Sequence, residues 1–189
     1  MEILVGLDPS FHRTGIAIYV NNKIIVSEVK ITPNPNKSFE QIYRDVMTQK
    51  NNIMREINDI LMSEKVYLME GLEVLSECPP PQGNFAPGLY ALDVSIFSAM
   101  RREGWGVYRV YPTYLGHVHG KRKYSKSESV ELAKEILSFY PHEIKSKRLS
   151  HDEAEAVIFL ARNMAKHCIL NTELMAKYEG LNSEKEVEL

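Results

Sequence analysis

Short apolar runs alternate with longer helical stripes along this 189-residue chain. The first run covers residues 3–7, which is long enough for one buried strand, and it ends at Asp8. Two more β-rich runs, 14–20 and 23–31, flank Asn21-Asn22, a pair that tolerates left-handed turn geometry. The pattern therefore predicts three antiparallel strands at the start of the domain.

Helical stripes separate these strands from two more. A capping-box pattern at Ser38 opens a long amphipathic helix. The next strand is predicted at 66–70 and ends at Glu70; because a helix joins it to the first strands, it should lie parallel to and beside the strand that carries Asp8. A fifth strand is predicted at 106–111. Further helices are predicted over residues 87–102, 125–140 and 150–168.

These elements predict an α/β fold with a five-stranded mixed sheet, in which three antiparallel strands are followed by two parallel ones and helices flank the sheet. We expect a single domain over residues 1–170 and an acidic tail at 171–189 that is partly disordered. A chain with 44% hydrophobic and 25% charged residues can bury one sizeable core.

The charge is distributed unevenly, although the net charge of −2 does not by itself indicate a nucleic-acid binder. The last eleven residues hold four Glu and one Lys, so the rest of the chain is mildly basic. Residues 116–126 combine two Gly and two His with four cations, which predicts a mobile loop that can approach a polyanion. Scattered surface charge is the alternative. No apolar run reaches membrane-spanning length, so we expect a cytoplasmic protein, or one in the host cytoplasm if its source is viral.

Several acidic residues are predicted to lie close enough together to bind a metal cation. If Asp8 and Glu70 end adjacent parallel strands, they repel one another unless a cation lies between them. A Glu70 that leaves its strand into solvent is the alternative. Asp152 and Glu155 share a face of the last helix, and His151 lies one turn before Glu155. Acids in a first turn can also serve only the helix dipole, which explains Asp152 better than Glu155.

Three stretches together resemble the RuvC family of Holliday-junction resolvases, in the ribonuclease-H-like nuclease superfamily, viral or phage-type members included. The segment from Ile3 to Ser10 with Thr14-Gly15 resembles the family's opening strand and turn. Leu68-Met-Glu70 resembles its second catalytic strand, and His151-Asp152-Glu-Ala-Glu155-Ala resembles its acidic helix. The resemblance covers residues 1–168; it departs from the family in having Glu155 where Asp is usual.

The resemblance implies a ribonuclease-H-like fold and a crossover junction endodeoxyribonuclease of DNA recombination and repair. Such an enzyme hydrolyses phosphodiester bonds in four-way (Holliday) junctions or other branched DNA, works as a homodimer and uses two Mg²⁺ or Mn²⁺ ions per site. The implied catalytic and metal-ligating residues are Asp8, Glu70, Asp152 and Glu155, with His151 and Lys126 as accessory residues. The implied phosphate contacts are Arg13, Arg101, Arg102, Lys121, Arg122, Lys123 and Lys126.

Two other classes of protein share part of this pattern. A catalytically weak protein that binds branched DNA would keep the basic segments and lose acids, whereas all four acids are present here. An actin-like or sugar-kinase-like nucleotide-binding fold also opens with a strand, an Asp and a Gly turn. That fold needs a duplicated domain and a second Asp-x-Gly loop, which the sequence does not predict.

Overall fold

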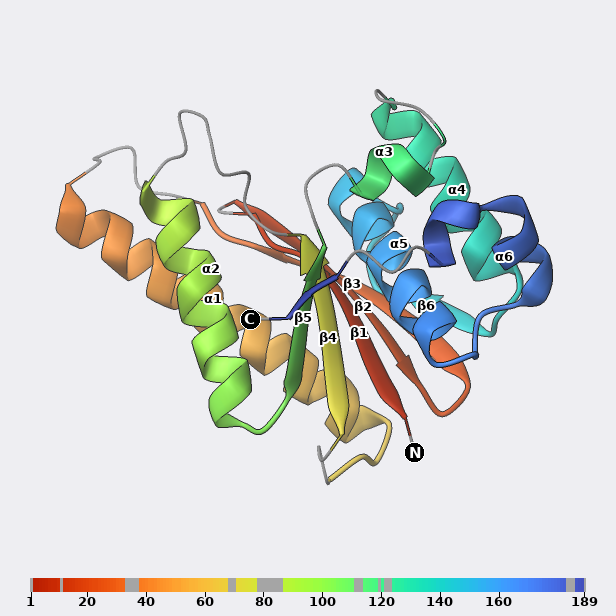
Figure 1. Ribbon diagram of the computed structural model, residues 1–189. Helices are drawn as coiled ribbons and strands as arrows, with labels where there is room; N and C mark the ends of the chain where they lie inside the picture. The colour runs from red at the N-terminus through yellow and green to blue at the C-terminus, as the bar shows by residue number, and fades with distance from the viewer. Residues whose placement is uncertain are drawn as a thin grey trace.

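The first three strands form the antiparallel meander that the sequence predicts (Figure 1). They are β1 (Ile3–Asp8), β2 (Arg13–Val20) and β3 (Lys23–Lys30). Asn21 and Asn22 connect β2 to β3 with φ angles of 51° and 60°, the left-handed pair that a tight hairpin requires.

The computed structural model describes residues 2–10, 12–32, 38–67, 71–77, 87–110, 114–118, 120, 124–182 and 186–188. Within these residues the strands form one seven-stranded sheet in the order β6-β3-β2-β1-β4-β5-β7. The added strands are β4 (Leu72–Glu77), β5 (Gly106–Val110), β6 (His142–Ile144) and β7 (Glu186–Glu188). Because β4 is parallel to β1 and β5 is parallel to β4, the predicted mixed arrangement is confirmed. The two edge strands were not predicted, since three residues are too few to show a period.

The strand predicted at 66–70 is wrong, because the strand beside β1 begins at Leu72. Val66 is buried, but its N–H donates to the carbonyl of Leu61 and so closes the end of the preceding helix. Gly71, with φ of 79°, then turns the chain into β4. Glu70 lies outside the described residues. The acid that ends the strand next to Asp8 is Glu77.

Helices cover both faces of the sheet, and each face has its own hydrophobic core (Figure 1). One face carries α1 (Phe39–Ser63) and α2 (Pro87–Arg102). The other carries α3 (Tyr114–Val118), α4 (Lys126–Ser138), α5 (His151–Lys166) and α6 (Thr172–Lys177), with a short 3₁₀ helix, η1 (Glu179–Asn182). Within the described part of the chain, no helix is both long and apolar enough to cross a bilayer.

Two expectations about local structure need adjusting. The predicted loop at 116–126 begins inside α3. The described part of the tail after residue 170 contains α6, η1 and β7. The capping boxes of α4 and α5 are complete. At α1 only half of the box forms, because Ser38 accepts from the Gln41 N–H while the Gln41 side chain donates to Asp45.

Candidate active site

Two carboxylates stand side by side at the end of the central parallel strands. Leu7 pairs with Ser76 in the register of β1 and β4, so the next positions along the two strands are Asp8 and Glu77. Side chains alternate between the faces of a strand. Leu4 and Leu75 belong to the core under α5, so Asp8 and Glu77, an even number of residues further on, face the same side.

Helix α5 lies unusually close to this part of the sheet, because two glycines face it. A Cβ atom on Gly15 would lie 2.0 Å from the carbonyl oxygen of Asp152, and one on Gly6 would lie 2.0 Å from that of Ala156. Any side chain at either position would therefore overlap the helix backbone. This backbone-to-backbone contact brings the first turns of α5, and with them Asp152 and Glu155, to the edge that holds Asp8.

His151 forms a cationic partner for the two helix acids. Its Nδ1 lies 3.7 Å from Asp152 Oδ1, and its Nε2 lies 2.8 Å from Glu155 Oε1. Hydrogen bonding to Asp152 and then to Glu155 raises the pKa of His151 to about 9, against a smaller opposing effect of burial. The imidazole is therefore charged at neutral pH and neutralises part of the acidic cluster.

Tyr124, which precedes α4, also reaches the cluster. Its hydroxyl donates to Glu155 Oε1 at 3.3 Å. Burial first, and then the charges of Glu155, Glu77 and Asp8, raise the pKa of Tyr124 above its ordinary value, so it stays a neutral hydrogen-bond donor. Lys126, at the start of α4, is near enough for its charge to lower the pKa of His151.

Burial and neighbouring acids raise the pKa of the two strand acids at this edge, Asp8 and Glu77. Burial raises the pKa of Asp8 well above its ordinary value, and the charges of Glu155, Asp152 and Glu77 raise it further. Burial and the charge of Glu155 raise the pKa of Glu77 to about 8. Among the described residues, the charge of His151 is the effect that lowers the pKa of Asp8, so both strand acids hold their protons to higher pH than free carboxyl groups do.

The structure brings together most of the acids that the sequence singles out. Asp8, Asp152, Glu155 and His151 lie at one site, and the predicted accessory residue Lys126 lies beside it. Arg13 begins β2 at the same edge. Arg101 and Arg102, which are predicted phosphate contacts, end α2 next to the start of β5 and so lie at the opposite end of the strands from Asp8. Lys121, Arg122 and Lys123 lie outside the described residues.

Two site residues were missed by the sequence reasoning. Glu77 lies outside the strand that the sequence predicts at 66–70, because the run before Glu70 is more apolar than Leu72-Glu-Val-Leu-Ser-Glu77. Residues 72–77, which follow the turn at Gly71, combine apolar and polar side chains and end in an acid. This pattern is typical of a half-buried strand. Tyr124 had no signal in the sequence, since its contact with Glu155 spans 31 positions.

The donor set suits a hard divalent cation, because all four acids offer carboxyl oxygens and a cation would favour the ionised forms of Asp8 and Glu77. In their present rotamers, no three His, Cys, Asp or Glu side chains among the described residues form a group that could hold a metal ion. Glu155 instead contacts His151 and Tyr124. The residues therefore fit a metal by their chemistry, and their side chains would have to turn toward a common point to bind it.

Comparison with known proteins shows the fold. The chain is similar to the structure of RuvC from Thermus thermophilus, with a TM-score of 0.56 and 15% identity over 89% of this chain and 98% of that one. It is also similar to T. thermophilus RuvC in complex with a Holliday junction substrate, with a TM-score of 0.56 and 14% identity over 90% of this chain and 99% of that one. No family model and no curated protein matches the sequence. This chain therefore has the RuvC-like fold, as the sequence resemblance predicts.

Proposed function

We propose that this protein is a metal-dependent, structure-selective endodeoxyribonuclease that hydrolyses phosphodiester bonds in four-way junctions or other branched DNA. One observation supports this most: four acids from β1, β4 and α5 meet at one edge of a RuvC-like fold, close enough for three of them to raise the pKa of Asp8. A similar fold in T. thermophilus RuvC has been seen with a Holliday junction substrate, which supports DNA recombination and repair as the setting.

The residues of the site would divide the work as follows. Two Mg²⁺ or Mn²⁺ ions, when bound, would supply an activated water and neutralise charge on the leaving oxygen. Asp8, Glu77, Asp152 and Glu155 would hold these ions, and Asp8 is the acid on which the other three act. Glu77 must lose its proton before it can act as a ligand.

His151 and Tyr124 would position Glu155. Both contact its Oε1, at 2.8 Å and 3.3 Å, so they hold the longer acid that replaces the family's usual Asp. His151 also keeps a positive charge beside Asp152 and Glu155. That charge also lowers the pKa of Asp8, against the effect of the neighbouring acids.

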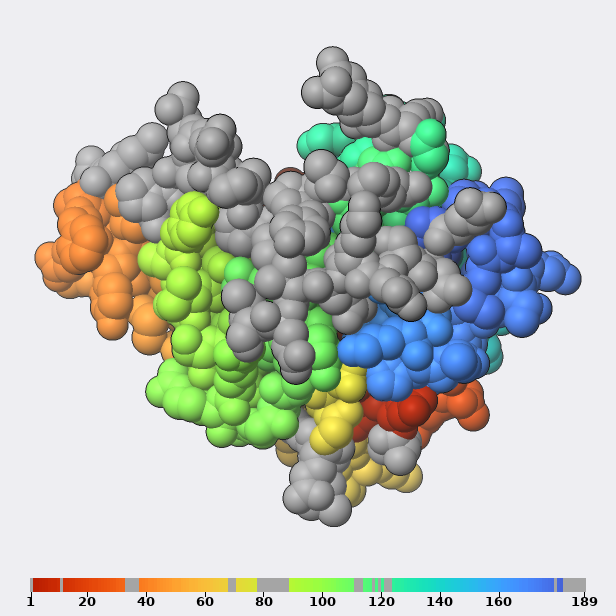
Figure 2. All heavy atoms as spheres, viewed as in Figure 1, coloured from red at the N-terminus to blue at the C-terminus, as the bar shows by residue number. Residues whose placement is uncertain are grey.

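The protein would act as a homodimer on a symmetric junction. Several large apolar side chains are exposed on the layer formed by α1 and α2: Phe39 (85%), Tyr43 (58%), Tyr90 (44%) and Val94 (59%). Both helices begin at the edge of the sheet that holds Asp8, and their surfaces lie side by side in the space-filling view (Figure 2). A partner copy on this layer would cover them.

The test is incubation of the purified protein with synthetic four-way, three-way and linear DNA in Mg²⁺, Mn²⁺ or EDTA. We expect paired nicks in the four-way junction with either metal and no cleavage in EDTA. Equal cleavage of linear duplex, or cleavage in EDTA, would contradict the proposal.

The same assay separates a second function, that of a branched-DNA-binding protein with weak catalysis. The contact between His151 and Glu155 favours it, because a cation of the protein already occupies one metal-ligand oxygen. Tight metal-independent binding of the four-way junction without cleavage would identify this second function. Within the described residues the strands form a single seven-stranded sheet, with no second copy of the domain that the actin-like alternative needs.

A further inference from the structure

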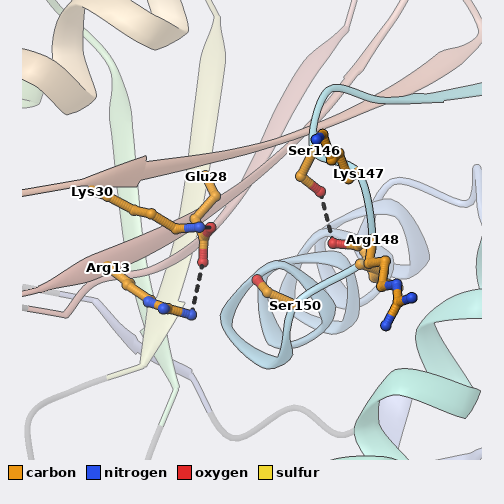
Figure 3. Close-up of a pocket in the computed structure, with 8 residues that line it drawn as sticks. Arg13, Glu28, Lys30, Ser146, Lys147, Arg148 and Ser150 are labelled. Carbon is orange, nitrogen blue, oxygen red and sulfur yellow. Dashed lines mark hydrogen bonds and ion pairs between the residues drawn. The ribbon is translucent and has the colours of Figure 1, made fainter.

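A basic pocket of about 700 Å³ opens beside the candidate active site. Figure 3 shows Arg13, Glu28 and Lys30, from β2 and β3, on one side and residues 146–150, which lead into α5, on the other. Four of the lining residues are cations and one is an acid: Arg13, Lys30, Lys147 and Arg148, against Glu28. A pocket with this excess of positive charge favours an anion.

The pocket lies on the same row of the sheet as the catalytic carboxylate. Asp8 pairs with Gly15, and Gly15 pairs with Glu28, so Glu28 stands two strands from Asp8 on the same face. With neighbouring strands about 4.8 Å apart, the separation along the row is about 10 Å. Ser150, at the other wall, directly precedes His151. The pocket therefore lies next to the candidate catalytic carboxylates, along the same edge of the sheet.

Glu28 fixes two of the cations at the pocket wall. Its side chain is 3% exposed, forms an ion pair with Lys30 and lies 3.9 Å from Arg13 Nη1. Its Oε1 accepts no hydrogen bond from any described residue. A buried carboxylate with one oxygen unbonded is costly, so this acid is better explained as a holder of Arg13 and Lys30 than as a packing residue.

The opposite wall is also held in place. Ser146 Oγ donates to Glu153 Oε2 at 3.0 Å, and the Ser150 N–H donates to the same oxygen at 2.7 Å. Because Glu153 is fully buried in α5, the segment that carries Lys147 and Arg148 is tied to the helix that carries Asp152. Within the described part of the chain, Lys147 and Arg148 form no ion pair, so their charges remain available to a ligand.

We propose that this pocket is a phosphate subsite that holds a backbone phosphate of the DNA strand being cleaved. The inference rests on the proposed nuclease function, and it adds the position of the DNA strand on the protein surface. A separation of about 10 Å corresponds to about three nucleotides along a duplex axis, so the bound phosphate belongs within about three nucleotides of the cleaved bond. Arg side chains suit such a group because they can give a phosphate two parallel hydrogen bonds.

The test replaces single phosphates by neutral methylphosphonates on either side of the cleavage point of a four-way junction. Binding is measured in an Asp8→Asn background, so that the substrate stays intact. The pocket variant is Lys147→Gln/Arg148→Gln, which changes exposed side chains only. The matched control is Arg55→Gln/Lys134→Gln, which removes one Lys and one Arg from exposed faces of α1 and α4. Thermal melts check that each variant is folded.

In the parent, we expect one methylphosphonate position within about three nucleotides of the cleavage point to weaken binding by about tenfold. In the pocket variant the same position should cost less than twofold, while the control variant should behave as the parent. A second pair, Arg13→Gln/Lys30→Gln, should reproduce the pocket variant. If the wild-type protein cleaves junctions but the Asp8→Asn parent and every pocket variant show the same methylphosphonate penalties, the subsite is wrong and the nuclease stands. If the wild-type protein neither binds nor cleaves branched DNA, both proposals fail.

Discussion

At the scale of single residues, the site crowds carboxyl groups together and so disfavours the ionised forms of Asp8 and Glu77. Asp8 is surrounded by Glu155, Asp152 and Glu77, each of which raises its pKa, and His151 is the cation that opposes them. Such an arrangement destabilises a fold unless it has a ligand to bind, because like charges in a buried site repel. The presence of these acids at the end of a buried strand therefore supports a function that uses a cation.

The assignment of the second strand acid can be tested directly. Asp8→Asn and Glu77→Gln should each abolish cleavage and leave junction binding intact or tighter, because each removes metal-binding charge without removing packing. Glu70→Gln is the matched control, and it should keep most of its activity. Junction cleavage and gel-shift binding of the three variants are the measurements. If Glu70→Gln is inactive while Glu77→Gln cleaves normally, the assignment made from the β1–β4 register is wrong.

The raised pKa values also predict how stability depends on pH. Glu77 holds its proton up to about pH 8 in the folded protein and loses it near 4.5 when unfolded. Asp8 is shifted in the same direction. The contribution of His151 is fully present below pH 6.5 and is lost as the pH rises through about 9. The folded state therefore binds more protons than the unfolded chain between these limits, and its stability falls as the pH rises.

Thermal melts in EDTA between pH 5 and 9 should thus show a falling Tm. Added Mg²⁺ should raise the Tm, and by more at higher pH, because metal binding needs the ionised carboxylates. Glu77→Gln should flatten the fall over the range in which Glu77 titrates. A Tm in EDTA that rises steadily over this pH range would contradict the electrostatic description of the site.

At the scale of elements, the site depends on how closely α5 approaches the sheet. Gly6 and Gly15 let the helix backbone touch β1 and β2, and the capping box at Ser150 sets the residue at which the helix starts. The start determines which side chains occupy the first turns, and the close approach determines whether they reach Asp8. The close approach and the helix start thus depend on Gly6, Gly15 and Ser150, which are not candidate catalytic residues.

Gly15→Ala and Gly6→Ala should each destabilise the protein by about 3 kcal/mol or more, since the new Cβ overlaps helix backbone that cannot rotate away. The expected fall in Tm is about 6 °C or more. Folded Gly15→Ala protein should also lose activity, because α5 must move away from Asp8. Gly106→Ala is the control: its Cβ would lie 3.3 Å from the side chains of Glu73 and Tyr108, which can adjust. Equal melting temperatures for all three variants would refute this account of α5.

At the scale of the whole molecule, the two faces of the sheet have different roles. The face with α4 and α5 carries the acids, whereas the face with α1 and α2 exposes apolar side chains. Paired cleavage of a symmetric junction requires two sites that face the DNA together. A dimer formed through the α1–α2 layer would meet this requirement, because both helices start at the edge of the sheet where the acids lie.

Val94→Glu should therefore convert a dimer into a folded monomer, since a charge in an apolar interface is costly to bury. Sedimentation measures the mass of each species, and a thermal melt checks the fold. Glu131→Gln, on the exposed surface of α4, is a control that should stay dimeric. A wild-type protein that sediments as a monomer at every concentration, with and without junction DNA, would rule out the dimer.

Much of this molecule could be predicted from local pattern alone. The meander of β1, β2 and β3, the start of α5 at Ser150 and the acids Asp8, Asp152 and Glu155 all follow from periodicity, turn residues and helix caps. These signals are local, because a hairpin or a cap involves residues only a few positions apart.

Only the tertiary structure decided which acid accompanies Asp8 and what surrounds it. The register of β1 against β4 chose Glu77, although the more apolar run before Glu70 was the stronger strand signal. The contact of Tyr124 with Glu155 and the basic pocket formed by β2, β3 and residues 146–150 likewise join segments far apart in the chain. The burial of whole faces of the sheet and helices determines how strands pair and where helices dock. Because this burial depends on all the elements at once, no single segment of the sequence predicts it.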